Sequence, residues 1–145
     1  MDGRNHVRRT FMKIEMKPIG YVSHHAKEIP RSWKVSDVEG ELILDEIYKD
    51  GMKEIEAGQK IYVLFYFHKS PEFSEQFMRI RPPVHDRKVG VFFTHSPFRP
   101  NPIGLSVLEV IGVNGTSIRV KGIDMLDKTP ILDIKPVSTP WENKR

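Results

Sequence analysis

Short runs of apolar residues, separated by turn-forming residues, recur along the chain in a pattern typical of β-strands. The second half of residues 38–44 (VEGELIL) and all of residues 105–113 (LSVLEVIGV) alternate apolar with polar positions, as strands with one covered face do. Asn114 and Gly115 follow, and both tolerate positive φ, so they predict a two-residue hairpin turn into residues 116–121. Further strands are expected at residues 17–23, 89–94 and 131–134.

The most apolar run is residues 61–67 (IYVLFYF), which are β-branched, aromatic or aliphatic throughout. Such a run predicts a strand covered on both faces, inside a barrel or at a dimer interface. Helical signal is confined to residues 45–57, ended by Gly58, with a single helical turn expected at residues 71–76. About six or seven short strands with one or two short helices predict a mainly β protein, a small antiparallel β-barrel, and not a βαβ nucleotide-binding fold.

Length and composition narrow the class of protein. A chain of 145 residues favours one domain. It contains no cysteine, which excludes disulfide scaffolds, cysteine-based zinc sites and thiol catalysis, and which fits a cytoplasmic protein. No apolar run approaches the roughly 18 to 20 residues that a membrane-spanning helix needs, so no membrane partner is expected.

Charge is concentrated at the start of the chain. Residues 1–16 carry four basic and two acidic residues, which is half of the formal net charge of +4. This segment lacks the apolar stretch of a secretory signal, and we expect an N-terminal basic arm. The domain itself is expected at residues 17–140, with a short tail at residues 141–145. The body is mildly basic, which permits an anionic partner such as RNA.

A stiff polar loop, residues 94–107 (THSPFRPNPIGLSV), joins two apolar runs. Each of its three prolines fixes its own φ and favours extended backbone at the residue before it, so the loop is preorganised. Arg99 offers a planar fork for a carboxylate, a phosphate or an aromatic face, and Asn101 offers both a donor and an acceptor. Gly104 permits a close approach of backbone to a ligand. The alternative is a structural turn, with Asn101 bonded to local backbone and Arg99 in solvent.

A second polar segment, residues 122–136 (GIDMLDKTPILDIKP), contains three carboxylates. Asp133 and Lys135 share one strand face and could pair with each other. Asp127 and Lys128 form a natural turn. Asp124 ends a strand, where it could face a ligand hydroxyl or cap a turn, and the pattern does not choose between these roles.

Residues 99–110 (RPNPIGLSVLEV) and residues 122–136 closely resemble the two hallmark segments of the TsaA-like, or TrmO, family. The pieces PIGYV (18–22), VLFYFH (63–68) and VGVFFTHSP (89–97) match in the same order, so the resemblance covers nearly the whole domain. It implies a β-barrel that binds S-adenosylmethionine, commonly as a homodimer. It also implies methylation of N6 of N6-threonylcarbamoyladenosine beside the tRNA anticodon.

The resemblance also implies roles for residues. The cofactor would be bound by Arg99, Asn101, Ile103, Gly104, Leu126, Asp127, Lys128 and Thr129. The candidates for a general base are Asp133, Asp124 and His95.

The carboxylate and the phosphates of the substrate need cations, for which we expect Arg31, Arg81 and Lys135, with Lys34, Arg79, Arg87 and Lys88 also available. Candidates for stacking on a base, as opposed to ordinary packing, are Trp33, Tyr66 and Phe98. No metal is expected, because the vicinal pair His24-His25 and the distant His85 lack the spacing of a ligand set.

The chain departs from the family pattern at three positions and at its end. Family members usually carry Arg at His95, often His at Phe98 and usually Tyr at Val137, and bacterial members tend to extend beyond the barrel. No G-x-G-x-x-G follows a strand, so the cofactor must be held otherwise than in a Rossmann fold. Two alternatives therefore stay open, which are a methyltransferase with a different substrate and a non-catalytic S-adenosylmethionine- or RNA-binding module.

Overall fold

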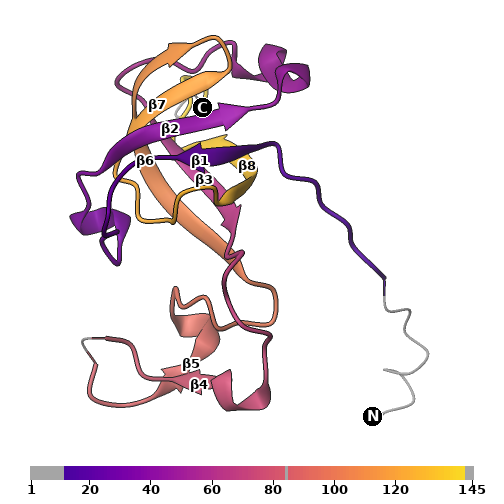
Figure 1. Ribbon diagram of the computed structural model, residues 1–145, viewed down its shortest axis with the longest axis vertical. Helices are drawn as coiled ribbons and strands as arrows, with labels where there is room; N and C mark the ends of the chain where they lie inside the picture. The colour runs from indigo at the N-terminus through magenta and orange to yellow at the C-terminus, as the bar shows by residue number, and fades with distance from the viewer. Residues whose placement is uncertain (1–11, 84, 143–145) are drawn as a thin grey trace.

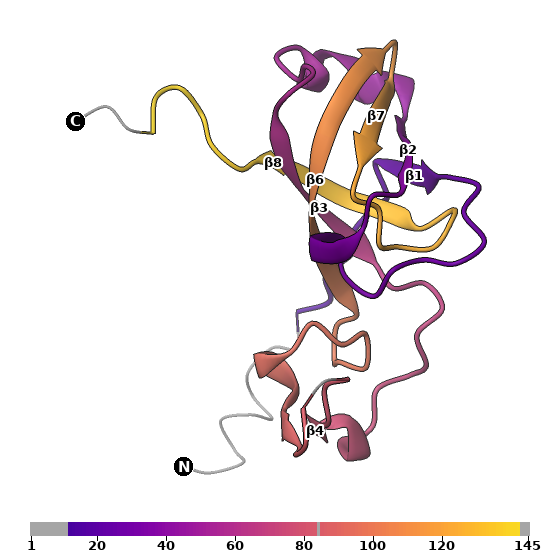
Figure 2. The ribbon, with the colours of Figure 1, turned by 90° about the vertical axis from the view of Figure 1, so that its left-hand side faces the viewer.

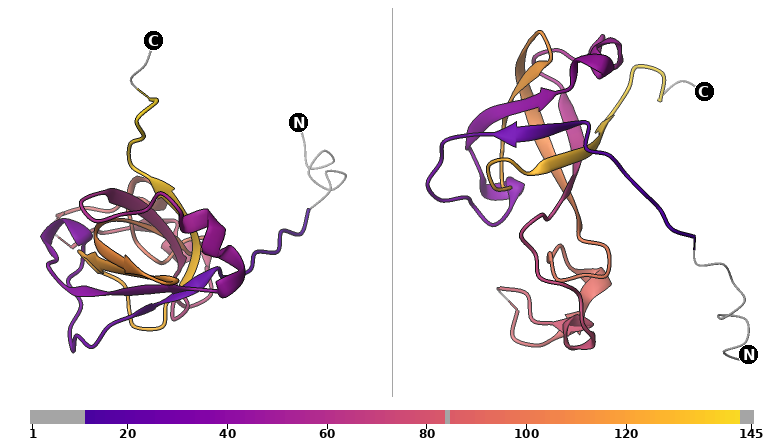
Figure 3. Two further views of the ribbon diagram at one scale, coloured as in Figure 1. Left: turned by 90° about the horizontal axis from the view of Figure 1, so that it is seen from above. Right: turned by 45° about the vertical axis from the view of Figure 1, so that its right-hand side comes forward.

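A computed structural model describes residues 12–83 and 85–142 of the protein. Six strands close into an antiparallel barrel in the order β1-β2-β7-β6-β3-β8, which confirms the predicted mainly β class (Figure 1; Figure 3, left). These strands are β1 Gly20–Ser23, β2 Glu39–Leu44, β3 Lys60–Tyr66, β6 Ile103–Asn114, β7 Ser117–Lys121 and β8 Pro130–Pro136. Within the described ranges, no helix is long and apolar enough to cross a membrane.

The barrel core follows from the alternation along its strands. On β3, Ile61, Val63 and Phe65 point inward and are buried, while Tyr62 and Leu64 between them are only half-buried. β3 pairs with β6 on one side and β8 on the other, and β8 closes the barrel by pairing with β1. The run at residues 61–67 is therefore covered on its inner face by the core, and its outer face stays partly open.

The hairpin between β6 and β7 lies one residue further along than the sequence suggested. Asn114 pairs with Ser117, so Gly115 and Thr116 form the turn instead of Asn114 and Gly115. Gly115 takes φ +64°, whereas Thr116 keeps a negative φ. One positive φ at the first turn position is the requirement of a type II′ turn, which glycine meets without steric cost.

Two further local predictions were wrong. The helix expected at residues 45–57 is a 3₁₀ segment, η2 (Glu46–Met52), in which Met52 alone is buried, so no apolar face supports a longer α-helix. The strand expected at residues 89–94 stops after β5 (Val89–Gly90) and turns into η4 (Val91–Phe93). The turn is closed by Thr94, whose backbone N–H and hydroxyl both donate to the Val91 carbonyl, at 3.1 and 2.7 Å.

Residues 68–102 form a small projection from one end of the barrel, here called the β4–β5 lobe (Figures 1 and 2). β4 (Arg79–Ile80) pairs with β5, after the short turn η3 (Glu75–Phe77). The lobe leaves the barrel after β3 and returns at β6, where the Phe67 N–H donates to the Pro102 carbonyl at 2.8 Å. The proline-rich loop therefore lies where lobe and barrel meet.

The ends of the chain fall partly outside the described residues. Of the expected arm, residues 1–11 are not described, and residues 12–19 precede β1 without helix or strand. Of the expected tail, residues 143–145 are not described.

One more short 3₁₀ turn, η1 (Trp33–Val35), lies between β1 and β2. It lines one side of the candidate site described below.

Candidate active site

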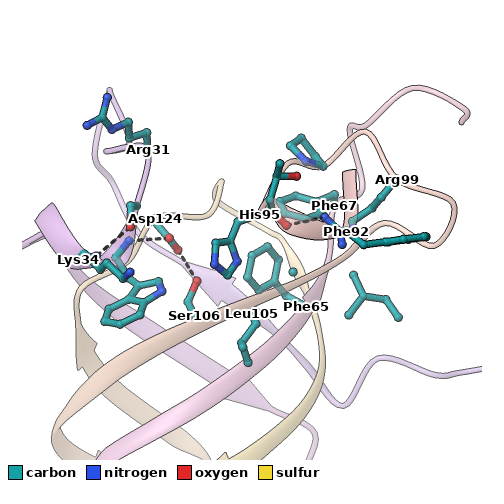
Figure 4. A pocket seen from close by; sticks show the side chains of 16 residues that line it. Arg31, Lys34, Phe65, Phe67, Phe92, His95, Arg99, Leu105, Ser106 and Asp124 are labelled. Atoms are coloured by element: carbon teal, nitrogen blue, oxygen red, sulfur yellow. Dashed lines mark hydrogen bonds between the residues drawn. The ribbon is translucent and has the colours of Figure 1, made fainter. Parts of the chain in front are cut away.

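A cavity of about 460 Å³ opens where the β4–β5 lobe meets the barrel (Figure 4). This volume lies in the range of about 300 to 1,000 Å³ that is usual for small-molecule pockets. One side is formed by residues 31–34, and the other by lobe residues that include Phe92, His95 and Arg99. Residues of β3 and β6, together with Asp124, complete it. Four segments of the chain, residues 31–34, 65–67, 92–106 and Asp124, therefore meet around one hollow.

Asp124 is held in this cavity by a hydrogen bond to each of its carboxylate oxygens. Its Oδ1 accepts a hydrogen bond from the Ser106 hydroxyl at 2.5 Å, and its Oδ2 accepts one from the Trp33 N–H at 2.7 Å. Burial raises the pKa of Asp124 above its ordinary 3.8, while these hydrogen bonds and the charge of His95 oppose the rise. A fixed carboxylate with increased proton affinity, placed at a cavity, can act as a general base.

His95 reaches the same cavity from the lobe, and its ring points toward Ser106 and Asp124 (Figure 4). The backbone on both sides of it is held by Arg99. The Nη1 of Arg99 donates to the Thr94 carbonyl and to the Ser96 carbonyl, each at 3.0 Å. Arg99 thus lines the cavity and also holds the loop that presents His95. The sequence had suggested either a ligand-binding Arg99 or an Arg99 in solvent, and neither alternative included this bracing role.

Gly104 makes room for one wall of the cavity. It pairs with Phe65 across β3 and β6, and a Cβ atom at Gly104 would lie 2.3 Å from Cζ of the Phe65 ring. Phe65 in turn meets Phe67 edge-on, with ring centroids 5.0 Å apart. Phe65, Phe67 and Pro97 also line a second hollow of about 220 Å³, so these side chains separate two adjoining spaces.

The second hollow is bordered by Leu126 and Thr129 of the segment after β7. Thr129 is buried, and its hydroxyl donates to the Leu126 carbonyl at 2.7 Å. Lys128 takes φ +69°, and its N–H donates to the Val22 carbonyl at 2.7 Å. The segment is thereby fixed as a tight turn on the barrel wall.

His24, which the sequence did not favour as a metal ligand, holds this turn from the end of β1. Its backbone N–H donates to Asp127 Oδ1 at 3.0 Å, and its ring Nε2 lies 3.0 Å from the Met125 carbonyl. Because a carbonyl only accepts, Nε2 carries the proton, and Nδ1 accepts from the Ala26 N–H at 3.1 Å. The buried ring is thus fully used in hydrogen bonds. Within the parts of the chain that are described, no cluster of His, Cys, Asp or Glu could hold a metal ion.

The structure separates the three candidates for a general base. Asp124 and His95 line one cavity, whereas Asp133 lies on the outer face of β8, opposite Leu64. Asp133 pairs with Lys135, the alternative that the sequence allowed for these two residues, at 3.1 Å between Oδ2 and Nζ. Neither residue lines the cavity that holds the other candidates.

The remaining candidates are distributed as follows. Ile103 and Arg31 line the larger cavity. Neither hollow is lined by Asn101, Asp127 or Lys128, which are exposed. Arg81 is exposed on the β4–β5 lobe, just after β4.

The aromatic candidates differ in their surroundings. Trp33 lines the cavity, and the Lys34 Nζ lies 5.6 Å from its ring centroid. Phe98 stacks on Phe77, with centroids 4.9 Å apart. Tyr66 is partly exposed on the barrel wall.

Sequence reasoning missed Ser106 and Phe92. Ser106 is fully buried at an inward position of β6, whose residues alternate between buried and exposed. A polar residue at such a position could have indicated a functional role. Phe92 had no such signal, because residues 89–94 resemble an ordinary strand.

The family model of the tRNA-methyltransferase O N-terminal domain matches residues 21–141. An S-adenosyl-L-methionine-binding protein of Archaeoglobus fulgidus is 39% identical over 126 residues, which cover 85% of this chain and 88% of that protein. A human tRNA (adenine(37)-N6)-methyltransferase is 40% identical over 90 residues, which cover 61% of this chain and 20% of that protein.

A crystal structure of TrmO from Pseudomonas aeruginosa superimposes with a TM-score of 0.71 and 30% identity, covering 94% of this chain and 59% of that one. The chain thus spans about three fifths of the TrmO chain that it matches. Agreement of sequence and fold over nearly the whole barrel confirms the resemblance seen in the two polar segments. The chain belongs to the TrmO family, through its tRNA-methyltransferase O N-terminal domain.

Proposed function

We propose that the protein is an S-adenosylmethionine-dependent tRNA methyltransferase, and that it methylates N6 of N6-threonylcarbamoyladenosine beside the anticodon. The names of its relatives, an S-adenosyl-L-methionine-binding protein and a tRNA (adenine(37)-N6)-methyltransferase, support the class. The observation that carries the proposal is the Asp124 carboxylate, held by Ser106 and Trp33 in a cavity that adjoins a second hollow.

The residues around the two hollows fit the cofactor. S-adenosylmethionine supplies an activated methyl group on a sulfonium cation, attached to a flat purine nucleoside. The second hollow offers the apolar and aromatic side chains of Phe67, Phe98 and Leu126 for a purine, with Thr129 beside them. Phe65 and Phe67 border both spaces, and aromatic faces attract cations. We assign the smaller hollow to the nucleoside and the larger cavity to the substrate base.

The chemistry requires a proton acceptor. The urea-like N6 of the substrate carries one proton, and it must lose this proton when the new N–C bond to the methyl group forms. Asp124 is placed to accept it, because its carboxylate faces the cavity and burial increases its proton affinity. His95 lies beside Asp124 and is exposed, so it connects the carboxylate with solvent. Arg99 keeps His95 in that position through the two flanking carbonyls.

Cations at the rim suit the substrate's carboxylate. Arg31 and Lys34 are exposed and line the side of the cavity that faces the lobe. A threonylcarbamoyl group carries a carboxylate some distance from N6, and an Arg side chain can bind it through two parallel hydrogen bonds. An unmodified adenosine would leave these cations unpaired, so the rim favours the modified base.

A methylation assay tests the proposal. Purified protein is incubated with S-adenosylmethionine and either tRNA carrying the threonylcarbamoyl group or the same tRNA without it, and calorimetry measures cofactor binding. We expect product only from the modified tRNA. Methylation of both tRNAs would indicate a different substrate. Cofactor binding without methylation of either would indicate the non-catalytic module.

We also propose a homodimer formed through the outer faces of β3 and β6. Tyr66 and Leu105 are each 43% exposed there, although both are large apolar or aromatic residues. Leu105 also lines the larger cavity, so a second copy seated on this face would help to close the site. Light scattering on wild-type protein and on Leu105→Glu tests this arrangement. A wild-type monomer would contradict it.

A further inference from the structure

The β4–β5 lobe presents two adjacent phenylalanines to solvent. Phe92 is 74% exposed and Phe93 is 87% exposed, and both border an open hollow of about 520 Å³. Such neighbouring aromatic side chains outside a core commonly mark a binding surface. The lobe does not need them for its own packing, because that is provided by buried Val91 and by the stack of Phe77 on Phe98.

The same lobe holds most of the positive charge of the domain. Residues 68–102 contain six basic and three acidic residues, a formal charge of +3 in a chain of +4. Since residues 1–16 contribute +2, the remainder of the chain is slightly negative. Four of the lobe's basic residues are exposed on or beside its two-stranded ribbon, namely Arg79, Arg81, Arg87 and Lys88.

Aromatic and basic groups lie on one structural unit. The Arg79 side chain lines the hollow beside Phe92 and Phe93, and its Nη2 donates to the Lys88 carbonyl across the ribbon at 3.1 Å. Arg and aromatic residues are common at protein interfaces too, but a formal charge of +3 on one small lobe suits the phosphates of single-stranded nucleic acids, whose base faces also stack on aromatic rings. The combination therefore favours RNA over another protein.

This surface is continuous with the candidate active site. Phe92 lines both the larger cavity and the hollow of the lobe, and the Arg99 guanidinium carbon lies 6.0 Å from its ring centroid. A nucleotide held in the cavity would thus have its neighbours along the strand beside Phe92 and Phe93. Single-stranded loops, whose bases can unstack, are the RNA elements that proteins bind in this way.

We propose that the β4–β5 lobe is a binding surface for single-stranded RNA, on which unpaired bases next to the target nucleotide stack on Phe92 and Phe93. Exposed Arg79, Arg81, Arg87 and Lys88 contact the phosphates of the same strand. The proposal rests on the proposed function, since it takes the RNA of that reaction as its ligand. It adds a location for RNA binding outside the cavity.

The experiment measures binding of a labelled anticodon stem-loop RNA and of a fully paired RNA of equal length by fluorescence anisotropy. The test variant is Phe93→Ala, because Phe93 does not line the active-site cavity. Its matched control is Ile47→Ala, an apolar side chain that is 80% exposed on η2. We expect Phe93→Ala to weaken stem-loop binding about tenfold, as loss of one base stack does, with the control unchanged.

A charge variant gives a second readout. Arg87→Glu combined with Lys88→Glu should reduce the slope of log affinity against log salt by about 0.7 for each phosphate that the protein no longer neutralises. Circular dichroism establishes that each variant is folded, and calorimetry shows whether S-adenosylmethionine still binds.

The outcomes separate the two proposals. Equal RNA affinity of wild type and both lobe variants would overturn the lobe proposal and leave the proposed function intact. A change of oligomeric state in Phe93→Ala, with RNA affinity retained, would assign this surface to a second copy and overturn it as well. If the wild type bound neither RNA, the proposed substrate class would fail, and the lobe proposal with it.

Discussion

The hydroxyl of Ser106 on β6 donates to Asp124 after β7, with 2.5 Å between Oγ and Oδ1. Ser106 is fully buried, and the second carboxylate oxygen accepts from the Trp33 N–H at 2.7 Å. Two donors from separate segments thus orient one carboxylate at the cavity. Since burial raises the pKa of this group despite both bonds, its ionised form is stabilised less than in water.

Asp124→Asn should remove activity while the protein stays as stable as wild type, or becomes more stable, at neutral pH. An asparagine oxygen can accept from Trp33, and its NH₂ can donate to Ser106. Without a base at this position, turnover is expected to fall by about 100-fold to 10,000-fold. Asp37→Asn, at an exposed carboxylate, is the control.

The pH dependence of stability follows from the raised pKa of Asp124. The folded protein binds this proton more tightly than the unfolded chain, whose carboxyl titrates near 3.8. The stability that the proton contributes is fully present below that value and is lost as pH rises through the raised pKa. Melting temperatures of wild type and Asp124→Asn should therefore converge toward acid pH. A variant that melted well below wild type at neutral pH would contradict this account.

Arg99→Ala should lower turnover more than it weakens cofactor binding. Its Nη1 binds the carbonyls of Thr94 and Ser96, so its loss releases the loop that presents His95. A misplaced catalytic group can cost on the order of a hundredfold in rate. Arg119→Ala, which removes an exposed guanidinium paired with Glu39, is the control for loss of charge. If cofactor affinity fell as steeply as turnover, Arg99 would instead contact the cofactor.

The strands of this fold were largely predictable, because their alternation depends on neighbouring residues. β2, β6 and β7 lie within a residue or two of the predicted runs. Residues 91–94, which form a 3₁₀ turn after β5, were mistaken for a continuation of the strand, since Phe92 and Phe93 suit a strand as well as an exposed surface. The Thr94 hydroxyl closes the turn by donating to the Val91 carbonyl. A pattern of apolar and polar residues does not reveal such a hydrogen bond.

The site was predictable only in part, for a related reason. Asp124, His95 and Arg31 were named from separate segments, and they do line one cavity. Their partners depend on tertiary structure, because Ser106 meets Asp124 only when β6 and β7 pair in the observed register. Asp133, another carboxylate of the same motif, faces outward through a register shift at Leu64 and Phe65 on β3.

Gly104→Ala should destabilise the protein and deform the cavity. The added Cβ would lie within 2.3 Å of the Phe65 ring, in a well-packed strand pair. Overpacking of this kind costs about 1 to 3 kcal/mol, and here it would displace the wall between the two hollows. Gly112→Ala on the same strand is the matched control, because nothing lies within 4 Å of its Cβ position. Thermal melts and cofactor affinity measure both effects, and equal behaviour of the two variants would contradict the role of Phe65.

His24→Ala should weaken cofactor binding although the ring lies behind the hollow. The imidazole donates to the Met125 carbonyl and accepts from the Ala26 N–H, so its removal leaves two backbone groups without their partner. An unsatisfied buried group costs about 1 to 3 kcal/mol, and the turn at Leu126 and Thr129 would lose its support. The adjacent and exposed His25, changed to Ala, is the control. Calorimetry with S-adenosylmethionine should show weaker binding in His24→Ala and wild-type affinity in His25→Ala. Unchanged affinity in a folded His24→Ala protein would mean that the turn does not depend on this histidine.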